Sequence, residues 1–340
     1  MSLRWDRLDA GAANAWSDLT NLLAEVDGTE EFYDPQDLAE ELAESGVDPS
    51  QDTWAVRDGE QLIAFGQLRV RDGLTEGRVR AYLGGGVHPD YRGQGIGRQL
   101  MDRLEARAME LSAQRHPGVP VCLSVGGGLD SDPVRPMLVH RGYERVRYFH
   151  QMERALPGEQ LPGEQLRGEQ LRGEQSTDGQ STGGAYDIAP LTVEVYPAEL
   201  AEPMRIAHND AFSTHFGFAP QSPQEWQDGI SSRTFRPDCS MVIRDGADRN
   251  RVLCYVMAYS YAPGELYIGR VGTIRSARGH GLARAGLLET LRLAIAAGYS
   301  KAELDVDSIN PSGAGALYES VGFKRTKTTA VFDRVVPGRA

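Results

Sequence analysis

The chain has 340 residues, of which 40% are hydrophobic and 25% are charged, as expected for a globular protein of about two domains. A formal net charge of −12 argues against nucleic-acid or anionic-membrane partners. Three widely spaced cysteines fit a reducing cytoplasmic location and no metal site, and no apolar run predicts a signal peptide or a membrane span.

Apolar periodicity and turn residues predict alternating strands and helices in the first half of the chain. The expected elements are a strand at 3–8, helices at 12–26 and 36–44, strands at 53–57, 61–71 and 78–87, a helix ending near 114, a strand at 119–125, a short helix at 133–140 and a strand at 143–154. Residues 27–35 form an acidic loop, which is either a solvated surface or an attraction for a cationic substrate.

A low-complexity segment follows. The pentapeptide from Leu156 to Gln160 recurs from Leu161, and again with Arg in place of Pro from Leu166 and Leu171. Because this composition cannot build a core, residues 156–185 are predicted to be a linker between domains at 1–155 and 186–340. A partner-binding role for the repeat is the alternative.

The second half repeats the order of the first. The expected elements are a strand at 188–195, helices at 203–212 and 223–230, strands at 239–244, 252–261 and 266–274, a helix from 282, a strand at 302–306, a helix at 312–320 and a strand at 326–332. A duplicated domain is therefore expected.

Each half places a glycine-rich turn between a strand and a helix. The turns are Arg92-Gly93-Gln94-Gly95-Ile96-Gly97 and Arg278-Gly279-His280-Gly281-Leu282-Ala283, and both fit the pattern [Arg/Gln]-x-x-Gly-x-[Gly/Ala]. Unpaired N–H groups at a helix start bind anions, glycine allows close approach, and Arg278 would add a guanidinium. The alternative is a tight turn without a ligand. A dinucleotide fingerprint fits less well, since position 100 is Leu.

Each half then ends in a helix and a Gly-aromatic pair. The two endings are Leu138-Val139-His140-Arg141-Gly142-Tyr143 and Leu317-Tyr318-Glu319-Ser320-Val321-Gly322-Phe323. With the turns, these features resemble the GNAT superfamily of acyl-CoA-dependent N-acetyltransferases over essentially the whole chain outside the linker. The duplication is similar to the tandem actinobacterial type that includes mycothiol synthase. The resemblance implies an α/β fold class: two tandem domains, each a central mixed sheet flanked by helices.

The resemblance also implies a coenzyme site for acetyl-CoA in the second half. The pyrophosphate would bind residues 278–283, and the pantetheine arm would pair with Val271, Gly272 and Thr273. Tyr318 would donate a proton to the departing thiolate, unless it is only a packing aromatic. Asn310 resembles a coenzyme-contacting residue, but it lies eight positions before Tyr318 where the family has seven.

The general base has several candidates. Glu265 is expected near the family position, and strand alternation puts it on one face with Tyr267, Val271 and Thr273; its alternative is a hairpin-turn residue. Asp305 or Asp307 on the next strand is a further candidate, which would polarise the amine. The alternative is that both lie at a strand end exposed to solvent. Both His208 and His215 have a suitable pKa, although a lone histidine is more often structural.

The first half departs from the family pattern. Gly85, Gly86, Val87 and the turn at 92–97 are intact, so a coenzyme site or its remnant is expected there. Leu138 replaces the proton donor, and neither Val79 nor Ala81 is a base. The chemistry, transfer of an acetyl group to a small-molecule primary amine, is therefore assigned to the second half of a monomer or homodimer. The alternatives are a non-catalytic acyl-CoA sensor or scaffold and a protein acetyltransferase.

Overall fold

The structure is a computed structural model that describes residues 3–44, 46–157, 191–309 and 313–339. The N-terminal half contains β1 (Arg4–Asp6), α1 (Ala13–Asp27), α2 (Pro35–Leu42), α3 (Pro49–Asp52), β2 (Thr53–Asp58), β3 (Gln61–Thr75), β4 (Arg78–Val87), α4 (Ile96–Arg115), β5 (Val121–Gly126), α5 (Val134–His140) and β6 (Glu144–Ala155). The C-terminal half contains β7 (Leu191–Val195), α6 (Ala201–Phe212), α7 (Pro223–Ser231), β8 (Met241–Asp245), β9 (Val252–Tyr259), β10 (Glu265–Thr273), α8 (Leu282–Ala296), β11 (Lys301–Asp307), α9 (Ala314–Ser320) and β12 (Lys324–Val336). The predicted α/β class and the repeated order are confirmed.

Local sequence signals set the helix boundaries. Asp34 caps α2 by accepting a hydrogen bond from the N–H of Gln36 at 2.8 Å, and Ser222 and Glu225 form a capping box at the start of α7. Gly28, with a φ of 72°, ends α1 in the left-handed conformation. The short helix α3 was not predicted, because a helix of so few residues shows no apolar periodicity in the sequence.

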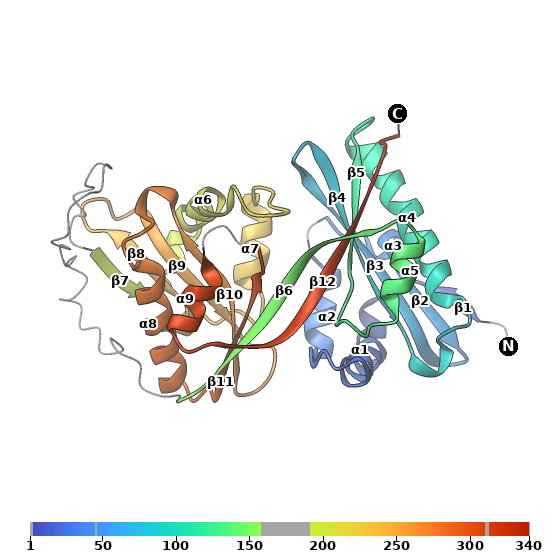
Figure 1. The fold of residues 1–340 in the computed structure, drawn as a ribbon, viewed down its shortest axis with the longest axis horizontal. Coiled ribbons are helices and arrows are strands. Elements are labelled where there is room, and N and C mark those ends of the chain that lie inside the picture. The colour runs from blue at the N-terminus through green and yellow to red at the C-terminus, as the bar shows by residue number, and fades with distance from the viewer. Residues whose placement is uncertain (1–2, 45, 158–190, 310–312, 340) are drawn as a thin grey trace.

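All the described strands belong to one sheet. Its strand order is β1-β2-β3-β4-β5-β12-β6-β11-β10-β9-β8-β7. The last strand of each half therefore lies in the other half: β6 pairs antiparallel with β11, and β12 pairs antiparallel with β5. The two exchanged strands also pair with each other, and Figure 1 shows them passing between the halves.

This exchange makes the two halves structurally interdependent. A cut at residue 155 would leave each half without the strand that covers β5 or β11, and so would expose an unpaired edge. The predicted linker at 156–185 lies outside the described residues except for residues 156 and 157.

Helices cover both faces of the sheet in each half. In the C-terminal half, α8 and α9 pack on one face and α6 and α7 on the other, and these will be called the α8–α9 face and the α6–α7 face. In the N-terminal half, α4 and α5 pack on one face and α1 and α2 on the other. Trp16 on α1 and Trp226 on α7 are buried against the sheet in the two halves. The parallel pairs β4–β5 and β10–β11 therefore lie between two helical layers.

Ion pairs join the halves besides the strands. Arg80 on β4 donates to Asp333 on the exchanged strand β12 at 2.9 Å, and both side chains are less than a tenth exposed. Arg233 pairs with Asp37 on α2 at 2.8 Å. Separating Arg80 from Asp333 would leave an uncompensated charge in a buried site, which is costly. The ion pair therefore holds β12 against the N-terminal half.

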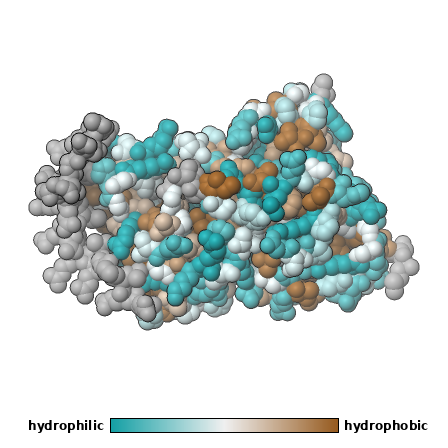
Figure 2. All heavy atoms as spheres, viewed as in Figure 1, coloured by the Kyte–Doolittle hydropathy of each residue, from teal (hydrophilic) through white to brown (hydrophobic). Residues whose placement is uncertain are grey.

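Hydrophilic residues cover most of the face seen in Figure 2, and apolar residues appear there only in small separate groups. The large apolar side chains lie in the layers between sheet and helices. Within the described residues, no helix has the length and apolar character that a bilayer crossing requires.

Candidate active site

The parallel strands β10 and β11 separate in the middle of the C-terminal half. They pair over three residues each, and the pairing ends at Tyr267 and Glu303. Beyond this point β10 stays paired with β9 as far as Thr273, and β11 stays paired with β6 as far as Asp307. The strand edges that face the gap are therefore available to hydrogen-bond an extended ligand.

A β-bulge lies in β10 beside this gap. The register against β9 shifts just after Ile268, and the extra residue reverses the side-chain alternation. Tyr267 packs on the α6–α7 face, whereas Val271 packs on the α8–α9 face. The prediction that Glu265 shares a face with Val271 and Thr273 is therefore wrong, because counting in steps of two does not allow for a bulge.

The turn after β10 leaves a row of free N–H groups. Gly279 and Gly281 have φ angles of 80° and 73°, which glycine adopts without strain. Helix α8 begins at Leu282 with no side-chain cap. Among the described residues, the N–H groups of 279–283 have no hydrogen-bond acceptor. A Cβ on either glycine would meet nothing within 4 Å, so the turn has open space for an anion.

The Arg278 side chain turns back onto the protein backbone, although the residue is exposed. Its guanidinium donates to the carbonyl of Ala211 at 2.7 Å and to that of Thr273 at 3.4 Å. Beside it, Asp210 accepts from the backbone N–H of Arg275 at 2.8 Å. These contacts join the turn to β10 and to the end of α6. The anion-binding prediction therefore depends on the backbone of the turn, while this guanidinium braces it.

The N-terminal half repeats this turn. Gly93 and Gly95 have φ angles of 75° and 84°, and α4 also begins without a side-chain cap. Arg92 donates to the carbonyl of Val87 at 3.1 Å and pairs with Asp27 at the end of α1 at 2.7 Å. The two turns that match in sequence thus match in structure.

The strand before the turn differs between the halves. The register of β4 against β3 is continuous from residue 81 to residue 87, so β4 has no bulge there. Its parallel pairing with β5 covers five residues and ends at Leu83 and Val125. Gly85 lies against β3, where a Cβ would be 2.6 Å from the Phe65 carbonyl, and Gly86 lies against Leu23. The N-terminal gap is therefore shorter and lacks the irregular backbone of the C-terminal one.

Tyr318 lies on α9 and packs on the α8–α9 face of the sheet. The residue is 9% exposed, and its ring packs edge-on against Phe323. Burial raises the pKa of Tyr318 to about 12, so the hydroxyl keeps its proton at neutral pH. The corresponding residue of the N-terminal half, Leu138, is fully buried and has no proton to give. Asn310 lies outside the described residues.

A pocket of about 260 Å³ lies beside the C-terminal gap on its other side. We call it the acidic pocket, because five carboxylates line it: Glu30, Glu31, Glu265, Glu303 and Asp305. The last three come from β10 and β11. The first two come from the loop between α1 and α2, so the N-terminal half forms one wall of a pocket on the C-terminal half.

Two lysines neutralise part of this charge. Lys301 pairs with Glu265 at 2.9 Å and also with Glu303. Lys327 pairs with Glu30 at 2.6 Å, and this hydrogen bond lowers the pKa of Glu30. Glu265, a candidate base from the sequence, thus lines this pocket with its carboxylate paired to Lys301.

Glu31 and Asp305 have no basic partner within ion-pairing distance among the described residues. Restricted access of water raises the pKa of Glu31, and the charge of Asp305 adds to the effect, although Glu31 is exposed as a residue. The same desolvation raises the pKa of Asp305, which accepts a hydrogen bond from the Tyr267 hydroxyl at 3.0 Å. Sequence reasoning did not single out Glu31; the acidic run at 27–35 was its only signal.

The two candidate histidines, His208 on α6 and His215 just after it, do not line the acidic pocket. His208 is 6% exposed and bonds through Nδ1 to the Tyr255 hydroxyl at 2.6 Å. Burial lowers the pKa of His208 to about 3, so it stays neutral. Burial also lowers the pKa of His215, whose ring packs against Phe212. The structural interpretation fits His208, which supports Tyr255 behind Gly272.

Comparison with solved structures shows the same fold. A GCN5-related N-acetyltransferase from Sphaerobacter thermophilus has a TM-score of 0.71 at 20% identity, covering 99% of this chain and 97% of that one. A tandem GNAT protein from the clavulanic acid biosynthesis pathway has a TM-score of 0.62 at 17% identity, covering 98% of each chain. N-myristoyltransferase from Saccharomyces cerevisiae, solved with myristoyl-CoA, has a TM-score of 0.60 at 13% identity, covering 98% of this chain and 78% of that one. No curated protein matches the chain in sequence.

The family model of the acetyltransferase (GNAT) family matches residues 16–117 and 202–323, about two-thirds of the chain. Each matched region contains one of the glycine-rich turns and the parallel strand that precedes it. The duplicated sheet, the two turns and the two matched regions agree: the chain belongs to the acetyltransferase (GNAT) family, as a transferase of the tandem type.

Proposed function

We propose that the protein transfers an acetyl group from acetyl-CoA to a primary amine of a small cationic molecule, and that the C-terminal half carries the chemistry. One observation carries this proposal: the acidic pocket lies where β10 and β11 separate, and Tyr318 packs on the opposite face of the same sheet. An amine held in the pocket would face an acyl group in the gap, with a proton donor behind it.

The residues around the gap fit the coenzyme. The turn at residues 278–283 would hold its pyrophosphate through the open N–H groups of 279–283, and the backbone of Val271, Gly272 and Thr273 would pair with its pantetheine arm. The coenzyme supplies the acetyl group as a thioester. Gly272 is required here because a Cβ would meet the ring of Tyr255, which extends from the neighbouring strand β9.

Asp305 is the general base that we propose, in place of Glu265. Both residues line the pocket, but Glu265 is neutralised by Lys301, whereas Asp305 accepts a hydrogen bond from the Tyr267 hydroxyl and has no ion-pair partner among the described residues. An amine must lose a proton to become a nucleophile, and a carboxylate with a raised pKa accepts that proton more readily than an ordinary one. Glu31 supplies the second uncompensated charge and holds the cation in place.

Tyr318 is the proposed proton donor to the departing sulfur. Its raised pKa keeps the hydroxyl protonated, and its place on the α8–α9 face separates it from the base. The N-terminal half would bind the coenzyme at residues 85–87 and 92–97 or retain only a remnant of that site, without chemistry, because it has Leu138 in place of the donor. Its contribution to the reaction is the wall that contains Glu31.

The test is release of free thiol from acetyl-CoA in the presence of primary amines of increasing positive charge. We expect diamines, polyamines and amino sugars with several amines to be acetylated, and neutral or anionic amino compounds of similar size to be poor acceptors. A preference for anionic acceptors would contradict the proposal. Coenzyme binding without thiol release for any amine would favour the acyl-CoA sensor instead.

A further inference from the structure

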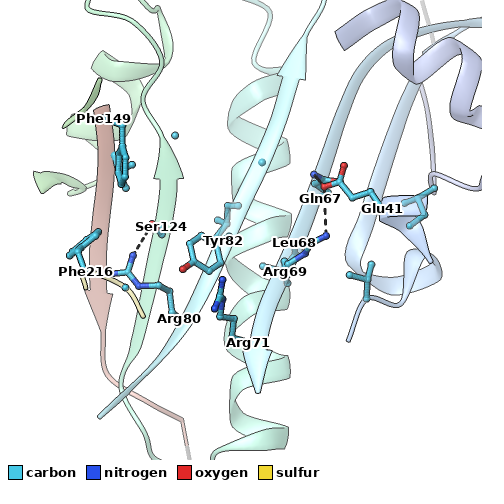
Figure 3. Close-up of a pocket in the computed structure, with 17 residues that line it drawn as sticks. Glu41, Gln67, Leu68, Arg69, Arg71, Arg80, Tyr82, Ser124, Phe149 and Phe216 are labelled. Atoms are coloured by element: carbon cyan, nitrogen blue, oxygen red, sulfur yellow. Dashed lines mark hydrogen bonds and ion pairs between the residues drawn. The ribbon is translucent and has the colours of Figure 1, made fainter. Parts of the chain in front are cut away.

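A second cavity, of about 440 Å³, lies in the N-terminal half at the place that the acidic pocket occupies in the C-terminal half. Strands β3, β4 and β5 form its floor, and Phe216 and Gly217, from the loop between α6 and α7, form part of its wall. Each half therefore covers the pocket of the other with the loop that follows its first long helix. We call this cavity the arginine pocket, after Arg69, Arg71 and Arg80 (Figure 3).

Among the described residues, the lining of the arginine pocket holds three guanidinium groups and one carboxylate, that of Glu41. Arg69 pairs with Glu44 at 2.7 Å and with Glu41 at 3.7 Å, and Arg80 pairs with Asp333 at 2.9 Å. Arg71 has no carboxylate within ion-pairing distance in the described part of the chain, and its guanidinium lies 5.7 Å from the centre of the Tyr82 ring. Arg71 thus gives the pocket an uncompensated positive charge.

Aromatic rings lie beside these guanidinium groups. Arg80 lies 4.7 Å from the ring centre of Phe216 and donates to the Ser124 hydroxyl at 3.2 Å. Figure 3 shows Tyr82 between Arg80 and Arg71, with Phe149 beyond Phe216. Guanidinium groups bind carboxylates through paired hydrogen bonds, and aromatic walls favour a flat apolar body. The pocket therefore suits a molecule with both features.

The loop over the arginine pocket is connected to the C-terminal coenzyme turn. Phe216 follows α6 by a few residues, and the end of α6 supplies Asp210 to Arg275 and the Ala211 carbonyl to Arg278. A molecule that packs against Phe216 therefore touches the segment that braces the turn. We propose that the arginine pocket binds a small planar organic anion, separate from the acetyl acceptor, and that its occupancy stabilises the loop between α6 and α7.

The test is direct binding to the full chain without acetyl-CoA or amine, so it does not depend on the proposed catalytic function. The probes are benzoate and phenyl phosphate, measured by calorimetry and by the shift in melting temperature; benzamide and benzylamine are the neutral and cationic controls. We expect both anions to bind at millimolar concentration or tighter, with neither control competing. If only phenyl phosphate binds, the claim that the guanidinium groups recognise a planar carboxylate is wrong. If neither anion binds, the whole proposal is wrong.

Two variants locate the site. Arg71→Gln should weaken benzoate binding by about tenfold or more, because a charge-assisted contact is lost, and Phe216→Ala should weaken it through the lost wall. Arg249→Gln removes the same charge from an exposed loop and should bind benzoate as the unmodified protein does. Since Arg71 is only half-buried, its variant should keep the circular dichroism spectrum of the parent. Equal binding by the Arg71 and Arg249 variants would refute this location.

Discussion

Replacing Asp305 by Asn tests the proposed base with little change of shape. The Asn side-chain oxygen can still accept the hydrogen bond that Tyr267 now donates at 3.0 Å. The substitution therefore removes the negative charge and the basicity of residue 305 while keeping its main contact. The pocket should remain closed by the loop that carries Glu31, so changes in rate report on the carboxylate itself.

Two effects of this substitution can be separated. A hydrogen bond to a charged group contributes about 1.5–3 kcal/mol, and the lower end applies because Asp305 is an exposed residue whose charge water partly screens. KM for the amine should then rise about tenfold. Loss of a general base lowers kcat by a further factor on the order of 10² or more.

Initial rates of thiol release at varied amine concentration and pH measure both effects. In the unmodified enzyme, kcat/KM should fall as pH decreases through the raised pKa of Asp305, because the protonated acid cannot accept the amine proton. Asp307→Asn is the matched control, since Asp307 lies on the same strand and faces Arg147 at 3.9 Å. If Asp305→Asn keeps the kcat and the acidic limb of the unmodified enzyme, Asp305 is not the base.

Three further substitutions have defined outcomes. Tyr318→Phe should reduce kcat by a factor on the order of tens or more while leaving acetyl-CoA affinity unchanged, and an unchanged kcat would reject the proton-donor role. His208 has a pKa of about 3 when folded and 6.5 when unfolded; the unfolded chain therefore binds the extra proton between these values, and stability is lost as pH falls. Relative to His208→Gln, the unfolding free energy should fall by about 1.4 kcal/mol per pH unit below pH 6 in urea titrations; a constant difference would contradict a buried neutral histidine. Gly272→Ala should cost about 1–3 kcal/mol of stability in the same titrations, because the new methyl group displaces Tyr255, and no loss would mean that the strand is not tightly packed there.

The sequence was sufficient to predict the order of elements and the position of both turns. The expectation that Leu138 leaves the first half without a proton donor came from the family resemblance and remains a prediction. Periodicity placed α4 and α8 after the glycine-rich turns, and the repeated pattern of arginine and glycines gave the position of both turns. These features depend on residues that are close in the sequence, so short-range sequence patterns can predict them.

The strand exchange, the bulge and the shared pockets were not predictable from such patterns. The alternation of residues 144–155 is compatible with pairing to β5 or to β11, and only the assembled sheet decides between them. The extra residue after Ile268 moves Val271 to the other face, and its one sequence signal is Gly269 inside the strand, which the alternation argument did not use. Glu31 and Phe216 lie in loops that cover the opposite half, and no short-range signal specifies a contact at such sequence separation.

Calorimetric titration of acetyl-CoA into two matched variants is the most direct test that the C-terminal half holds the acetyl donor. Gly281→Glu and Gly95→Glu place the same carboxylate at the same left-handed position of the two turns, whose φ angles are 73° and 84°. We predict that Gly281→Glu abolishes thiol release and removes acetyl-CoA binding from the C-terminal half, whereas Gly95→Glu keeps thiol release. Turnover that survives in Gly281→Glu and disappears in Gly95→Glu would contradict the assignment of chemistry to the C-terminal half.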